Sequence, residues 1–227
     1  QPIVSLHDGT RVGAEALSRF PAEWQMAPDE VFAQAALVHA DTALEMLAFR
    51  RAADHLEQIE GYLAINFSPS TLLEPGCREL LADLPAERVL LELSEHDPVA
   101  DYPELASALA PLRASGMRLA IDDVGAGYSS LRHILMTEPD VIKLDRSIAA
   151  GAAGDEVLAT LVGSLVDFAH GCGAVVVAEG IETAADAEVL GSRGVDHGQG
   201  WYFGRPGPPD ALMERYDTAP GGTVVSR

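Results

Sequence analysis

Short apolar runs recur along the chain, and each closes on a carboxylate, an amide or a lysine. The runs VGAEAL, YLAIN, VLLE, RLAIDD, VIK and AVVVAE carry, in this order, Glu15, Asn66, Glu92, Asp122 with Asp123, Lys143 and Glu179. Buried parallel strands read as near-continuous apolar runs. In barrels of alternating strands and helices, the active site lies where those strands stop. The repeated pattern therefore predicts one pocket lined mainly by oxygen ligands.

Helical segments separate the expected strands. We expect strands near 62–66, 89–93, 118–122, 141–144 and 174–178, with helices such as 102–115 and 155–172 between them. Gly116 and Gly173 stand where helix C-caps precede the next strand. Residues 2–6 and 12–17 flank a His-Asp-Gly-Thr turn, which predicts an N-terminal β-hairpin. Residues 29–60 are rich in helix formers with apolar residues at helical spacing, which predicts a long helical segment.

The spacing of the polar strand ends favours a barrel. From Asn66 to Glu179 they follow one another at intervals of 21 to 36 residues, close to the ~30 residues of one strand–helix unit in a barrel of eight such units. The alternative is a doubly wound open sheet, which gathers its site at one switch point rather than at every strand end. We therefore predict an α/β fold, a (β/α)8 TIM-type barrel, over residues 1–217. Residues 218–227 carry Gly and Ser and are expected to form a disordered tail.

Charge narrows the range of ligands. Fifteen basic residues against 35 acidic ones give a net charge of −20. A surface that follows a nucleic-acid backbone needs clustered Lys and Arg, so long DNA or RNA is not an expected partner. A small phosphorylated ligand is compatible with this charge if divalent cations mask the acidic pocket.

The apolar stretches, the cysteines and the first residue indicate where in the cell the protein is located and whether it has further domains. We expect no membrane contact from this chain, because it has no apolar stretch long enough to span a bilayer. Cys77 and Cys172 form no metal-type pair and are expected to be packing residues in a reducing, cytoplasmic compartment. The first residue is Gln1 rather than Met, from which we expect a domain of a longer protein.

The oxygen-only ligand set predicts a metal site. Taken alone, each Glu is most simply a solvated charge at a strand end. Two carboxylates as close as Asp122 and Asp123 repel each other unless a cation lies between them. Mg²⁺, Mn²⁺ and Ca²⁺ prefer such ligands, whereas Zn²⁺ would want His or Cys. The five candidates exceed what one Mg²⁺ usually takes from protein, which predicts two metals. They are Glu15, Asn66, Glu92, Asp122 and Asp123.

Two further residues are candidates for catalysis. Lys143 faces the same rim and could hold or polarise a water or a phosphate oxygen, although a structural ion pair with Asp145 is the alternative. Glu179 follows four apolar residues, so burial should raise its pKa and suit it to general-base work. A role for Glu179 as a further metal ligand is the alternative, and the two roles are compatible.

The segment after Asp123 predicts a loop beside the metals. Gly125 and Gly127 resemble half of a dinucleotide-binding fingerprint, but the third glycine is absent. A loop that becomes ordered when substrate binds is the favoured interpretation.

Taken together, the motifs resemble a known family. Glu15-Ala16-Leu17 is followed by Arg19, and the blocks QPIV, AINFSP, LLELSE, IDDVGAGYSSL, DVIKLDRS, VVAEGIET and GQGWYFGRP occur in the family's order. Over nearly its whole length the chain resembles the EAL-domain cyclic di-GMP phosphodiesterases. The resemblance implies a (β/α)8 barrel whose first barrel strand runs antiparallel to the rest. It also implies hydrolysis of cyclic di-GMP to linear pGpG with two Mg²⁺ or Mn²⁺ ions per site, and inhibition by Ca²⁺.

The resemblance also implies roles for individual residues. The first metal would be held by Glu15, Asn66, Glu92 and Asp122. Asp122 would bridge to a second metal, supported by Asp123 and, directly or through water, by Glu179. Lys143 would orient the attacking water, and Glu179 would be the general base. Arg19 would contact a phosphate of the ligand, and Gln199 would line the pocket. Three residues would support the site from outside it: Glu95, holding the 123–131 loop; Glu182; and Asp145, supporting Lys143 or that loop.

The chain departs from the family's pattern at three positions. In the loop, Val124 and Ala126 replace the usual Phe and Thr, and Trp201 stands where Tyr is more usual. The loss of the threonine hydroxyl could loosen the loop or weaken its coupling to dimerisation.

The resemblance further implies a homodimer and a sensor or GGDEF domain fused to this one. A catalytically silent cyclic di-GMP receptor is the alternative function, but the chain keeps every metal-site position. An unrelated Mg²⁺-dependent barrel enzyme would not explain the order of the motifs.

Overall fold

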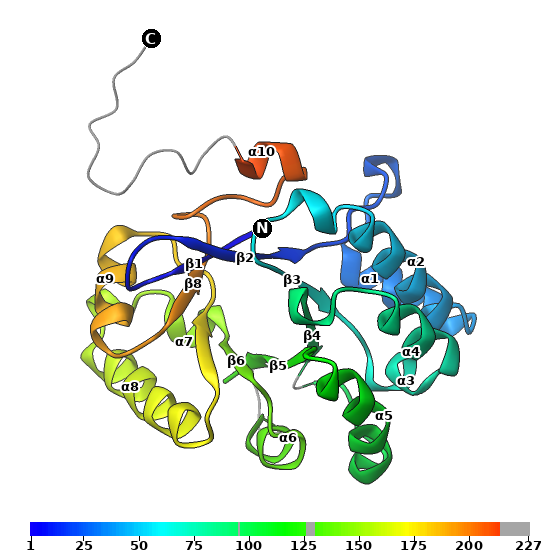
Figure 1. Cartoon of the computed structure of the whole chain (residues 1–227). Helices are drawn as coiled ribbons and strands as arrows, with labels where there is room; N and C mark the ends of the chain where they lie inside the picture. Colours follow the sequence, from blue (N-terminus) through cyan, green and yellow to red (C-terminus); the bar gives the residue numbers. More distant parts are fainter. Residues whose placement is uncertain (95, 126–129, 214–227) are drawn as a thin grey trace.

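Within the residues that it describes, the chain forms eight strands that close into a barrel in sequence order (Figure 1). The computed structural model describes residues 1–94, 96–125 and 130–213, apart from the side chains of 130, 131 and 213. The strands are β1 Pro2–Ser5, β2 Arg11–Ala16, β3 Tyr62–Asn66, β4 Val89–Ser94, β5 Arg118–Val124, β6 Val141–Leu144, β7 Val175–Ala178 and β8 His197–Gln199. β1 pairs antiparallel with both β2 and β8, and the other neighbouring strands pair parallel.

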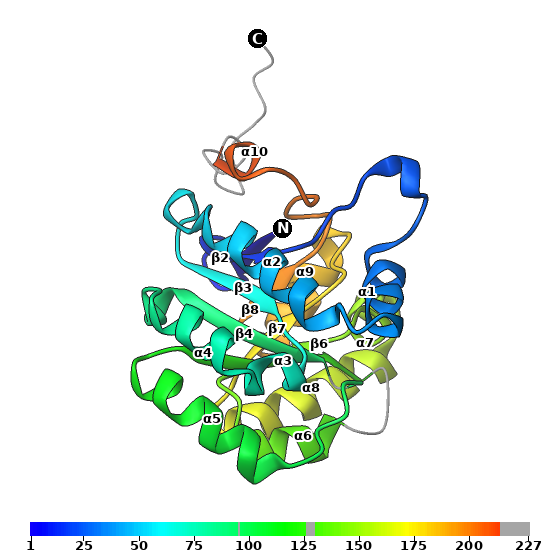
Figure 2. The ribbon, with the colours of Figure 1, turned by 90° about the vertical axis from the view of Figure 1, so that its right-hand side faces the viewer.

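Helices surround this barrel and connect its parallel strands (Figures 1 and 2). They are α1 Pro28–Leu37, α2 Asp41–Ala53, α3 Pro69–Leu73, α4 Pro75–Ala82, α5 Tyr102–Ala114, α6 Ser130–Thr137, α7 Arg146–Ala149, α8 Glu156–Gly171, α9 Ala184–Ser192 and α10 Pro209–Met213. Single turns of 3₁₀-helix lie at Ala22–Trp24, Leu56–Gln58, Ala86–Arg88 and Ala152–Gly154. None of the described helices combines the length and the apolar character that crossing a bilayer requires.

Two apolar layers hold the barrel together. One fills the barrel interior and consists of Ile3, Tyr62, Ala64, Leu90, Ala120, Val141 and Val177. The other lies between the barrel and its helices and includes residues such as Leu63, Leu91 and Ile121. The two layers follow from the alternation of side chains along a strand, because successive residues point to opposite faces. Every second residue of a strand is therefore committed to the barrel interior.

The structure confirms the predicted barrel and its antiparallel first strand. The five expected internal strands agree with β3 to β7 within two residues, and the N-terminal hairpin is formed by β1 and β2. Gly116 and Gly173 follow α5 and α8 with positive φ, as C-cap glycines do. The predicted end of the barrel at residue 217 and the predicted disordered tail lie outside the described residues.

Three sequence-based expectations were wrong or incomplete. The single helical segment expected over 29–60 is interrupted after Leu37, because His39 adopts a left-handed conformation with φ of 56°. β8 was not foreseen as a strand, because His-Gly-Gln contains no apolar run. Cys77 is buried as expected, whereas Cys172 is exposed.

Gly61 is fixed by the close approach of two strands. Its φ is 76°, and a Cβ at this position would lie 1.9 Å from the carbonyl oxygen of Val12. Gly151 also has a left-handed φ, 84°, but a Cβ there would meet nothing within 4 Å. We expect Gly151→Ala to lower the free energy of unfolding by only the ~1–2 kcal/mol cost of the left-handed conformation. Gly61→Ala should cost clearly more, because the backbone of β2 must also move. Urea unfolding of the two variants measures the difference, and equal losses would contradict this account.

Candidate active site

The alternation along the strands gathers the polar strand ends inside one end of the barrel. On β3 the inward residues Tyr62 and Ala64 are followed two positions later by Asn66, and on β4 Leu90 is followed by Glu92. The same step of two residues leads from an inward apolar residue to a polar one on three more strands: Ala120 to Asp122, Val141 to Lys143, and Val177 to Glu179. These side chains thus stand one layer above the apolar interior, at the carboxyl ends of the parallel strands.

Asp123 joins this site through a break in the strand geometry. In a regular strand, Asp122 and Asp123 would point to opposite faces. The pairing of β5 with β6 shifts register between Ile121 and Val124, and Asp123 has a φ of 59°. Oxygens of Asp122, Asp123 and Glu179 lie within 4.8 Å of one another. A non-glycine residue in this conformation costs about 1–3 kcal/mol and typically marks a functional site.

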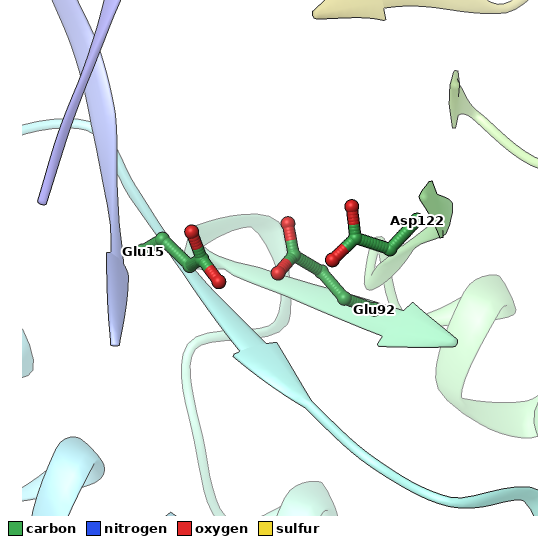
Figure 3. Close-up of side chains that lie close together, drawn as sticks. All are labelled: Glu15, Glu92 and Asp122. Atoms are coloured by element: carbon green, nitrogen blue, oxygen red, sulfur yellow. The ribbon is translucent and has the colours of Figure 1, made fainter. Parts of the chain in front are cut away.

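The carboxylates form two groups that share Asp122. The first consists of Glu15, Glu92 and Asp122, whose side chains converge from β2, β4 and β5 (Figure 3). The second consists of Asp122, Asp123 and Glu179, and in each group the oxygens lie within 4.8 Å of one another. Asn66 lies beside the first group, and its Nδ2 donates a hydrogen bond of 3.0 Å to Glu15. Asp122 is the one residue that the two groups share.

Lys143 lies at the centre of these carboxylates and is 0% exposed. Its Nζ is 2.7 Å from Glu179, 3.0 Å from Glu92, 3.1 Å from Asp122 and 3.8 Å from Glu15. The alternative ion pair with Asp145 is not formed. The Asp145 carboxylate instead caps α7 by accepting a hydrogen bond from the Ser147 amide, and its own amide donates to the Val124 carbonyl. Asp145 therefore contacts Val124, next to Asp123, rather than Lys143.

Burial and crowding of like charges shift the pKa values at this site. Burial raises the pKa of Glu92 well above its usual range, and the neighbouring carboxylates add to the effect. Burial likewise raises the pKa of Glu179 to about 7, as its sequence context predicts. Burial alone would lower the pKa of Lys143, but the surrounding carboxylates raise it well above its usual value. The pKa of Glu15 falls, because Lys143, Gln199 and Asn66 together outweigh its burial.

The donor set fits hard divalent cations. Both oxygens of Glu92 are buried and accept no hydrogen bond from any described residue. Among these residues its ion-pair partner is Lys143, which it shares with three other carboxylates, and buried carboxylates that outnumber their cation partners usually serve a further cation. The site contains five carboxylates, and the single positive charge of Lys143 can neutralise at most one of them. They belong to Glu15, Glu92, Asp122, Asp123 and Glu179. Oxygen ligands of this kind suit Mg²⁺, Mn²⁺ or Ca²⁺.

Two pockets adjoin the site and share Glu15. One, of about 320 Å³, is lined by Glu15, Asp122, Asp123, Glu179, Glu182 and Gln199, among others. The other, of about 850 Å³, extends under α2 and is lined by Arg19, Glu15 and Asn66 together with many apolar residues. Gln199 is buried and donates to Glu15. Arg19 is exposed, and Nη1 of its guanidinium donates to the Ser18 carbonyl.

Sequence reasoning missed one basic residue at the pocket. Arg146 lines the smaller pocket, and its guanidinium lies 3.3 Å from the Glu182 carboxylate. Only its position directly after Asp145 in the DVIKLDRS block could have indicated it. Glu182 lines the same pocket. Of the loop residues, Val124 is 2% exposed and packs in the outer apolar layer. Glu95 and Ala126 lie outside the described residues.

Comparison with known proteins places this site in a family. The family model of the EAL domain matches residues 1–206. Cyclic di-GMP phosphodiesterase PdeL of Escherichia coli is 28% identical over 236 residues, which cover 98% of this chain and 65% of that protein. The chain spans between 33% and 65% of the length of the first curated relatives it matches.

Solved structures show the same fold. Klebsiella pneumoniae BlrP1, in a complex with manganese and cyclic di-GMP, matches with a TM-score of 0.77 and 32% identity, over 91% of this chain and 54% of that one. The PaMucR phosphodiesterase, in a complex with cyclic di-GMP, matches with a TM-score of 0.80 and 26% identity, over 93% of this chain and 92% of that one. The family match, the barrel and the motifs at its strand ends lead to one conclusion: this chain belongs to the EAL domain family.

Proposed function

We propose that this chain hydrolyses cyclic di-GMP to linear pGpG with two divalent cations, Mg²⁺ or Mn²⁺. The observation that carries the proposal is the pair of carboxylate groups that share Asp122 around the buried Lys143. The substrate is supported by relatives named cyclic di-GMP phosphodiesterases and by neighbours solved with cyclic di-GMP. The cations are supported by BlrP1 complexes that contain manganese or calcium.

The residues have distinct tasks in this reaction. Glu15, Asn66, Glu92 and Asp122 would hold one metal, and Asp122, Asp123 and Glu179 the other. Bound there, the metals would neutralise the phosphate and lower the pKa of a water. Lys143 donates a hydrogen bond that orients this water toward phosphorus. Glu179 accepts one proton of the water as the new P–O bond forms and the P–O bond to the ribose 3′ oxygen breaks. The leaving 3′ oxygen takes up a proton from solvent, which opens the ring and gives pGpG with a free 3′ hydroxyl. A base with a pKa of about 7 suits this transfer at neutral pH.

We also propose a homodimer and a sensor or GGDEF domain in the same protein. The coverage of longer relatives supports further domains, and exposed Leu135 and Met136 on α6 support self-association. Sedimentation of this chain at several concentrations tests the dimer, and a monomer at every concentration would contradict it.

Metal substitution tests the proposed centre. With cyclic di-GMP as substrate, we expect turnover in Mg²⁺ and Mn²⁺ and at least tenfold slower turnover in Ca²⁺. Ca²⁺ has longer and more variable ligand distances, so it positions water less well. Ca²⁺ should nevertheless bind, which a rise in Tm measures. Equal rates with all three ions, or turnover in EDTA, would contradict the proposal. Tight binding of cyclic di-GMP without turnover in any ion would identify a receptor instead.

A further inference from the structure

Trp201 follows β8 and lies at the mouth of the smaller pocket. It is the one aromatic side chain among the described residues that line this pocket, together with Glu15, Asp122 and Glu179. Trp201 is 52% exposed. An exposed indole next to a metal centre offers a flat apolar surface that carboxylates cannot provide.

The backbone around Trp201 is held in place by the segment after β7. The Ile181 amide donates to the Gln199 carbonyl, and the Tyr202 amide donates to the Ile181 carbonyl, both at 3.0 Å. Gly200 lies so close to this segment that a Cβ would be 2.1 Å from the Ile181 oxygen. The residue that carries the indole is thus fixed between two hydrogen-bonded neighbours. Such preorganisation lowers the entropy cost of binding a ligand.

Arg205 covers part of the indole and leaves the rest accessible. Its guanidinium carbon lies 3.9 Å from the centroid of the Trp201 ring, which is cation–π geometry. With this contact in place Trp201 is still 52% exposed, which leaves surface of the residue for a ligand. Arg205 does not line the pocket, so its effect on a ligand would pass mainly through the orientation of Trp201.

We propose that Trp201 stacks on one guanine base of the bound cyclic dinucleotide and that Arg205 positions the indole for this contact. The inference rests on the proposed function and adds to it a site for a base. Metals and Lys143 can hold the phosphates but do not bind the bases. Every nucleobase has a flat face, and aromatic side chains are the usual partners for it. Trp201 is then a residue that sets substrate affinity rather than the rate of the chemical step.

Kinetics separate this role from a structural one. Trp201→Ala should raise KM, and the Kd for cyclic di-GMP measured in Ca²⁺, by about 5- to 100-fold, which is the usual effect of removing one stacking partner. We expect kcat to change less than threefold, and Trp201→Phe to restore most of the affinity. Tyr202→Ala is the matched control, since Tyr202 is adjacent and 45% exposed but does not line the pocket. Unchanged KM and Kd in Trp201→Ala would overturn the proposal.

Fluorescence tests the contact directly. The chain has two tryptophans, so Trp24→Phe leaves Trp201 as the single reporter. Saturating cyclic di-GMP in Ca²⁺ should quench its emission, and unchanged emission would overturn the proposal. Arg205→Ala should weaken binding in the wild-type background and have no effect when Trp201 is already Ala. Additive effects would mean that Arg205 acts on the ligand by itself. A wild-type chain that neither binds nor hydrolyses cyclic di-GMP would refute the proposed function itself, and this inference with it.

Discussion

Replacing Glu179 by glutamine is expected to reduce turnover of cyclic di-GMP by at least 10²-fold while leaving its binding in Ca²⁺ within a few-fold of wild type. The change keeps the size of the side chain but removes the group that accepts the proton of the attacking water. General bases typically contribute about 10²- to 10⁴-fold to a rate. The position of Glu179 is suited to this role, because burial raises its pKa to about 7 and its carboxylate is 2.7 Å from the Lys143 ammonium. Single-turnover kinetics with saturating Mn²⁺ measures the effect.

The same variant separates the two roles of Glu179. If Glu179 acts mainly as the base, the number of Mn²⁺ ions bound by the Glu179→Gln protein stays near that of the wild type while its turnover falls. If occupancy falls in step with turnover, Glu179 acts as a metal ligand and the general-base assignment is wrong. Glu188→Gln is the matched control, because Glu188 is exposed on α9 and lies outside the site. We expect that control to change neither rate nor occupancy.

Replacing Lys143 by methionine is expected to have the second largest effect. It removes the cation that lies within 4 Å of four carboxylates and is itself 0% exposed. Breaking a buried ion pair from one side typically costs about 3–5 kcal/mol. We therefore expect the free energy of unfolding in EDTA to fall by about that amount. Turnover should fall by about 10²- to 10³-fold, as when one preorganised donor is removed.

Metal addition distinguishes this account from simple loss of packing. Mn²⁺ supplies positive charge at the same carboxylates, so it should raise the Tm of the Lys143→Met protein more than that of the wild type. Arg193→Met is the control: its ion pair with Glu156 lies at the surface, with 33% and 82% of the two side chains exposed. Such surface pairs contribute about 0–1 kcal/mol, so this variant should retain its stability. An equal Mn²⁺ shift in wild type and Lys143→Met would contradict the proposed role of Lys143.

The fold was largely predictable because its strands are buried on both faces. The runs YLAIN, VLLE and VIK have the apolar density that marks a barrel strand, and β3, β4 and β6 lie where those runs predict them. β8 could not be found in this way, since His197, Gly198 and Gln199 carry no apolar signal and pair only because the barrel must close. The break at His39 also lacks a local signal, because neither Gly nor Pro marks it.

At the site, sequence predicted which residues meet but not how they are arranged. Alternation along the strands accounts for Asn66, Glu92 and Asp122. The same alternation predicts that the Asp123 side chain points away from the site. Only the left-handed backbone conformation of Asp123 directs its carboxylate toward Asp122 and Glu179. The contact between Arg146 and Glu182 joins segments that follow two different strands, so only the folded chain reveals it. The same is true of Arg205 and Trp201, whose closeness depends on the turn between them.

The measurement that tests the central claim most directly is the identity of the product. The chain is incubated with cyclic di-GMP and Mn²⁺ in ¹⁸O-labelled water. The nucleotides are then separated by chromatography, and their masses are measured by mass spectrometry. We predict stoichiometric linear pGpG that carries one ¹⁸O in its terminal phosphate, and no product in EDTA. If cyclic di-GMP binds to saturation but is still intact after prolonged incubation, the chain is not a phosphodiesterase. It would then be a receptor for cyclic di-GMP.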